Sequence, residues 1–142
     1  MQILGVRIDE VTKKQALEKA QEFLYSDKSH KIFTPNPEML VDAQKDAGFK
    51  TVLNDGDLNL CDGFGLWLAT RPSLRGRRFA SADETIQSQI TRTPGTDFML
   101  DLCDLAEREG KSIYLLGSDS DEVLVTANKK NGLIKICVIC QV

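Results

Sequence analysis

The chain has 142 residues, which is enough for one domain that buries a sizeable core. With 42% hydrophobic and 27% charged residues, it has the composition of a globular protein rather than of a disordered segment or a coiled coil. The net charge of −3 lacks the basic excess that marks a nucleic-acid-binding protein, so we expect no nucleic-acid partner.

Short strands and amphipathic helices alternate along the chain, as judged from the period of the apolar residues. The elements expected in the first half are a β run over 3–8, a helix over 12–25, a strand over 31–34, a helix over 37–46, a strand over 57–60 and a helix over 65–70. After an irregular stretch come a weak helix over 83–91, a helix over 97–109, a strand over 112–116, a helix over 121–130 and a strand from 133 onward.

Residues suited to helix ends support three of these helices. Thr12 begins the first helix and has a glutamine three residues later, as a capping box requires. Asn36 is suited to cap the second helix, and Pro37 to occupy its first position. Thr96 is expected to cap the helix that ends at Gly110.

The alternation predicts an α/β fold, in which a Rossmann-like, mostly parallel sheet is flanked by helices in a single domain. The chain stops within or just after a strand, so we expect it to be incomplete at its C-terminus. An incomplete sheet has an open edge, which would favour association into a homo-oligomer.

Two polar strand ends form the main functional signal. Asp62 follows the strand over 57–60 and is flanked by Gly63 and Gly65, which would let a ligand approach the backbone. Thr34 ends the preceding strand, with Asn36 just beyond it. Because ligands bind at the carboxyl ends of strands in α/β sheets, we expect one shared pocket here.

Each of these residues also has a purely structural interpretation. Asp62 is suited to be a general base, but an Asp-Gly pair also simply makes a turn, and the spacing does not separate the two. The Thr34 hydroxyl either holds a substrate or only ends a strand. For Asn36, helix capping is favoured over ligand contact.

Two further segments are suited to phosphate. Arg92 precedes the helix over 97–109, whose N-terminal N–H groups and dipole favour an anion, although it could equally be an ordinary surface arginine. Gly117 lies in another strand-to-helix turn, but this single glycine is not a dinucleotide-binding fingerprint. The arginine-rich run over 71–78 is interpreted as a solvated loop rather than an anion-binding segment.

No metal or cofactor is expected. The Asp-x-Asp pairs at 55–57 and 119–121 lie among turn residues, where capping is favoured over metal binding. Cys137 and Cys140 have redox or zinc spacing, but the chain has one histidine and no second Cys-x-x-Cys. We interpret both as buried strand residues. The N-terminus has no signal peptide and no apolar stretch could span a bilayer, so the cysteines fit a reduced cytoplasmic compartment.

Four short motifs in order resemble the bacterial WecG/TagA/CpsF glycosyltransferase family, over nearly the whole chain. They are Thr34-Pro-Asn-Pro-Glu38, Asp62-Gly-Phe-Gly65, Arg92-Thr-Pro-Gly-Thr-Asp97 and Leu115-Leu-Gly117. The resemblance implies that residues 1–142 are a glycosyltransferase catalytic domain. It implies an inverting transfer of N-acetylmannosamine from UDP-ManNAc to undecaprenyl-diphosphate-GlcNAc, forming the β-1,4 linkage of wall teichoic acid biosynthesis.

The same resemblance implies roles for particular residues. Asp62 falls on the family's proposed base, Thr34 on its active-site threonine, and Arg92 on an arginine that faces the donor diphosphate. The stretch between Gly65 and Arg92 is longer and less regular than is usual in the family. Family members usually continue into a later site motif, and some then into a C-terminal appendage concerned with membrane docking; we expect this chain to lack both. The resemblance implies a peripheral protein on the inner face of the cell membrane.

Two other classes of function compete with the transferase. A non-catalytic nucleotide-binding α/β module would bind a nucleotide yet be indifferent to Asp62→Asn. A redox protein centred on Cys137 and Cys140 would have an unusually acidic thiol there. The order of the motifs favours the transferase.

Overall fold

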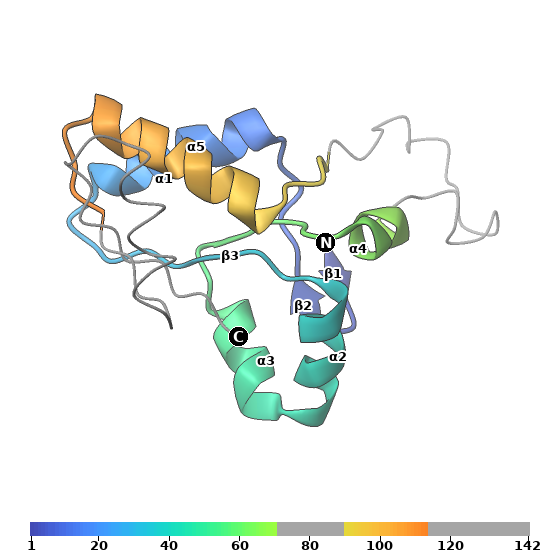
Figure 1. Ribbon diagram of the computed structural model, residues 1–142. Helices are drawn as coiled ribbons and strands as arrows, with labels where there is room; N and C mark the ends of the chain where they lie inside the picture. The colour runs from blue at the N-terminus through green and yellow to red at the C-terminus, as the bar shows by residue number, and fades with distance from the viewer. Residues whose placement is uncertain (71–89, 114–142) are drawn as a thin grey trace, which may run out of the picture. The chain divides into compact units, whose positions relative to one another are not determined.

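The computed structural model describes residues 1–70 and 90–113 (Figure 1). The chain divides into two compact units, Met1–Phe98 and Met99–Val142, and all of the described strands belong to the first. The elements expected over 83–91, 121–130 and 133–142 lie wholly or largely outside the described residues, as do Gly117, Cys137, Cys140 and the arginine-rich run.

The described elements alternate as the sequence predicts, but the strands are short. They are β1 (Gln2–Ile3), β2 (Val6–Arg7), α1 (Lys13–Leu24), β3 (Ile32–Phe33), α2 (Pro37–Lys45), α3 (Ala47–Asn54), β4 (Leu58–Asn59), α4 (Phe64–Ala69) and α5 (Gly95–Arg108). The strands form two pairs, β1 with β2 and β3 with β4. A mixed α/β architecture is therefore confirmed, and within residues 1–70 and 90–113 the strands form two short pairs rather than one larger sheet.

The N-terminal β run is a tight hairpin rather than one strand. β1 pairs with β2 in an antiparallel register, Gln2 opposite Arg7 and Ile3 opposite Val6. The two turn residues, Leu4 and Gly5, both have positive φ, 51° and 74°. Such a two-residue turn matches the twist of the strands that it joins. The expectation of a single strand over 3–8 was therefore wrong, because the alternating apolar residues did not reveal the reversal.

The predicted parallel pairing is present between β3 and β4, with Ile32 opposite Leu58 and Phe33 opposite Asn59. Hydrogen bonds in the same register continue beyond the strand ends. The backbone N–H of Leu60 donates to the carbonyl of Phe33 at 2.8 Å, and that of Asp62 donates to Pro35 at 3.1 Å. The two segments therefore remain paired in the same register up to the residues that the sequence singles out.

β4 is buried on both faces. Leu58, Asn59, Leu60 and Cys61 are all buried, so the polar residue Asn59 does not face solvent. The Asn59 amide instead donates to the carbonyls of Arg7 (2.9 Å) and Leu53 (2.7 Å). This side chain thus connects β4 to β2 and to the end of α3.

Local capping residues position the first two helices as predicted. The Thr12 hydroxyl accepts from the N–H of Gln15, whose side chain accepts from the Thr12 N–H, completing the capping box. The Asn36 side chain accepts from Met39 N–H at 2.8 Å at the start of α2. Both caps are confirmed.

A helix that was not predicted, α3, follows α2 directly, and the two lie side by side as a helical hairpin (Figure 1). Asp46 ends α2 and caps α3, because its carboxylate accepts from Phe49 N–H at 2.9 Å. The helix over 65–70 was predicted one residue too late, since α4 runs from Phe64 to Ala69. Apolar side chains of β2, α2, α3 and α4 meet in one core that includes Val6, Leu40, Ala43, Leu53, Cys61 and Leu66.

Candidate functional site

The candidate site lies where the segments after β3 and β4 end side by side. Register places Thr34 and Asp62 at the same edge, because Asp62 N–H donates to the carbonyl of Pro35, the residue after Thr34. Both Thr34 and Asp62 are half-buried. The predicted meeting of the two polar strand ends is therefore observed within the first unit.

A third segment reaches this edge just before α5. The backbone N–H of Thr93 donates to the carbonyl of Cys61 at 2.9 Å, and that of Thr91 to Val11 at 3.4 Å. Thr93 is buried. These bonds hold the start of α5 against the residue that precedes Asp62.

Gly95, the first residue of α5, bonds to the Asp62 side chain and lies close to that of Thr34. Its N–H donates to Asp62 Oδ2 at 3.1 Å. A Cβ atom on Gly95 would lie 2.8 Å from Thr34 Oγ1 and 3.4 Å from Asp62 Oδ2. No described residue donates a hydrogen bond to the other carboxylate oxygen of Asp62, Oδ1. Among the described residues, the carboxylate is thus held at one oxygen only.

The start of α5 corrects one expectation. Thr96 was predicted to cap this helix from outside, but the helix already begins at Gly95, so Thr96 lies within the first turn. Asp62, 33 residues earlier in the chain, supplies the carboxylate that accepts from this first N–H. A cap from so distant a residue cannot be recognised from local spacing.

The glycines after Asp62 differ in what the backbone requires. Gly63 has φ of 86°, a conformation that glycine adopts without strain, and a Cβ there would lie 3.0 Å from Pro37 Cδ. At Gly65 a Cβ would make only an ordinary contact with Pro37, at 3.6 Å. Gly63 therefore has a structural reason to be glycine, whereas at Gly65 neither space nor φ requires one.

The remaining predicted site residues are less closely tied to Asp62. Asn36 uses its side-chain oxygen to cap α2, so its structural interpretation is confirmed and substrate contact stays a prediction. Arg92 is exposed, and the described residues include no hydrogen-bond or ion-pair partner for its guanidinium. It lies three residues before Gly95, in the segment that Thr93 anchors.

Burial changes the chemistry of the residue before Asp62. Cys61 is a free, buried cysteine, and burial, followed by the nearby charge of Asp62, raises the pKa of its thiol to about 11. The thiol is therefore protonated at neutral pH and a poor nucleophile. The candidate catalytic groups at this edge are consequently the carboxylate of Asp62 and the hydroxyl of Thr34, rather than the thiol of Cys61.

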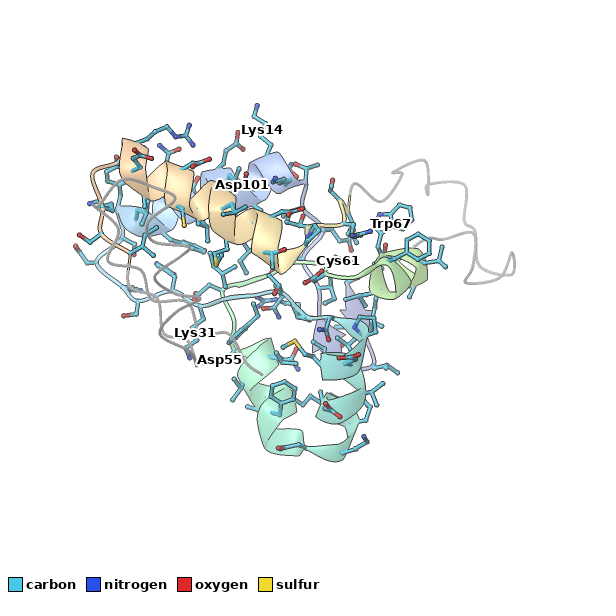
Figure 2. All side chains as sticks on the ribbon, viewed as in Figure 1. Lys14, Lys31, Asp55, Cys61, Trp67 and Asp101 are labelled. Atoms are coloured by element: carbon cyan, nitrogen blue, oxygen red, sulfur yellow. The ribbon has the colours of Figure 1, made fainter. Side chains whose placement is uncertain are left out.

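The Asp-x-Asp pair at 55–57 lies at the opposite end of the β3–β4 pair. Asp55 forms an ion pair with Lys31, and the two side chains lie together in Figure 2. Asp57 accepts from the Lys31 backbone N–H at 2.8 Å and lies 3.4 Å from His30 Nδ1. These backbone and side-chain bonds lower the pKa of Asp57. Within residues 1–70 and 90–113, no three side chains that bind metals are grouped as a metal site would require.

The structural roles of Gly95 in the site and of Asn59 in β4 were not recognised from the sequence. Gly95 was part of the motif before α5 but was not singled out, because the residues that crowd it, Thr34 and Asp62, are distant along the chain. Asn59 was expected only as a residue of the strand over 57–60, with no contact of its own. Its role in joining β2, α3 and β4 depends on contacts 6 and 52 residues away along the chain.

No helix within the described residues has the length and apolar character needed to cross a membrane. No curated protein matches the sequence. The family model of the glycosyl transferase WecG/TagA/CpsF family matches residues 1–134, which include every segment of the candidate site. The chain therefore belongs to the WecG/TagA/CpsF family of glycosyl transferases.

Proposed function

We propose that this chain is the catalytic domain of a TagA-type enzyme, with Asp62 as its general base. The reaction moves N-acetylmannosamine from UDP-ManNAc to the 4-hydroxyl of undecaprenyl-diphosphate-GlcNAc, with inversion to a β linkage, in wall teichoic acid biosynthesis. Family membership supports glycosyl transfer between a nucleotide-sugar donor and a lipid-linked acceptor. The finer assignment of sugar and acceptor is our proposal.

The observation that carries the proposal is that Asp62, Thr34 and Gly95 lie close together at one sheet edge, where the Gly95 N–H donates to Asp62. An inverting transfer needs one base, on the side of the sugar opposite the leaving group. The Asp62 carboxylate is fixed through Oδ2 by a backbone N–H, while Oδ1 has no donor among the described residues. A base held in this way keeps one oxygen for the acceptor hydroxyl.

In the proposed step, Asp62 takes the proton of the acceptor hydroxyl as its oxygen attacks C1 of the donor sugar. The bond from C1 to the diphosphate oxygen breaks, and UDP leaves with the bonding electron pair. Thr34, close to Gly95 and Asp62, orients a sugar hydroxyl. Arg92 is exposed and lies three residues before Gly95, and its guanidinium neutralises charge on the departing diphosphate. Asn36, Gly63, Gly65 and Gly117 are proposed to line the donor site.

The acceptor determines where such an enzyme works. An undecaprenyl chain resides in the bilayer, so we propose that the protein acts as a peripheral protein on the cytoplasmic face of the cell membrane. No metal or other cofactor takes part in the proposed step.

Two measurements test the proposal. Calorimetry should detect saturable binding of UDP that Arg92→Ala weakens. In a transfer assay, Asp62→Asn should lower the rate by about 10²–10⁴-fold, as expected for loss of a general base. Asp27→Asn, an exposed carboxylate in the loop before β3, is the matched control and should leave the rate unchanged. UDP binding together with full activity of Asp62→Asn would refute Asp62 as the base.

A further inference from the structure

Gly95 has no local reason to be glycine. Its φ lies outside the left-handed region in which glycine is favoured, unlike that of Gly5, Gly63 or Gly110. It occupies the first position of a 14-residue helix, where alanine is the better helix former. Neither the backbone conformation nor helix formation therefore explains the residue.

The space around Gly95 does explain it. A Cβ atom would come within 2.8 Å of Thr34 Oγ1 and 3.3 Å of Thr34 Cβ, closer than unstrained side chains approach. Thr34 is β-branched and follows β3 directly, so its side chain has few other rotamers. The same Cβ would lie 3.4 Å from Asp62 Oδ2, the oxygen that the Gly95 N–H holds.

We infer that Gly95 is a positioning residue for the transfer, which fixes the Asp62 carboxylate through its N–H and leaves room for the Thr34 hydroxyl beside it. This inference rests on the proposed function, because it assigns Gly95 to the same reaction. The backbone amide sets the orientation of the base, and the missing side chain keeps Thr34 and Asp62 close enough to contact one acceptor sugar.

Gly95→Ala tests the inference, because an ordinary helix start should accept alanine. We expect kcat to fall by about 10²-fold, the loss that a misplacement of roughly 1 Å can cause. UDP binding should stay close to that of the wild type. Gly48→Ala is the matched control: Gly48 also lies in the first turn of a helix, and its Cβ would meet only the exposed Asp46 carboxylate, at 3.2 Å.

A second substitution separates crowding from a general effect on the helix. Thr34→Ser keeps the hydroxyl but lacks the methyl group, so it can rotate away from a side chain at position 95. The double variant Gly95→Ala with Thr34→Ser should therefore lose less activity than the two single effects combined, as a double-mutant cycle measures. Additive losses would overturn the crowding argument.

A readout that needs no turnover tests the hydrogen bond itself. The NMR chemical shift of the Gly95 amide proton should change in Asp62→Ala, which removes the acceptor, and should stay unchanged in Asp27→Ala. An unchanged shift in Asp62→Ala would contradict the contact. Full activity of Gly95→Ala in an active enzyme would overturn the positioning role, whereas a wild-type chain that transfers no sugar would contradict the proposed function instead.

Discussion

Replacing Asn59 by alanine should destabilise the first unit strongly, although Asn59 touches no candidate substrate. The side chain is fully buried, and its amide donates to the carbonyls of Arg7 and Leu53. Two hydrogen bonds at about 0.5–1.5 kcal/mol each give about 1–3 kcal/mol. The small cavity left behind adds about 1 kcal/mol. We therefore expect the free energy of unfolding to fall by about 2–4 kcal/mol.

Urea unfolding followed by tryptophan fluorescence is the suitable assay, because Trp67 is the chain's only tryptophan and lies in the same unit as Asn59. Asn54→Ala is the matched control. Asn54 also makes two hydrogen bonds, from Arg7 N–H at 2.8 Å and to the Gly5 carbonyl at 2.9 Å, but it is not fully buried. Water can replace these bonds, so we expect a loss below about 1 kcal/mol. Equal losses for the two variants, or a loss below about 0.5 kcal/mol for Asn59→Ala, would refute the reasoning.

Two further predictions concern a cap and a thiol. Thr12→Ala removes the capping box of α1 and should lower the free energy of unfolding, measured in urea, by about 1 kcal/mol. Thr12→Ser should retain most of the stability. Equal free energies of unfolding for the two variants would speak against the cap. The raised pKa of Cys61, about 11, predicts that stability falls as pH rises from about 9 to 11, because the unfolded thiol releases its proton first. Cys61→Ala should remove this loss of stability at alkaline pH. If the pH dependence of the free energy of unfolding is unchanged in this variant, the raised pKa of Cys61 is contradicted.

Local rules predicted the elements whose determinants lie within a few residues of one another. The caps Thr12 and Asn36 act on N–H groups three residues away, so the starts of α1 and α2 could be recognised from the sequence. The parallel pairing of β3 and β4 followed from two strands separated by helical sequence. By contrast, α3 was missed, because it is short and directly follows α2.

For the candidate site, the sequence by itself determined that Thr34 and Asp62 end neighbouring parallel strands, and motif order indicated the family. Tertiary structure alone decided that the Gly95 N–H donates to the Asp62 carboxylate and that Asn59 is buried. The reason is distance along the chain. A strand end or a helix cap depends on adjacent residues, whereas the Asp62–Gly95 contact depends on where the segment after Ile90 packs, which no local pattern encodes.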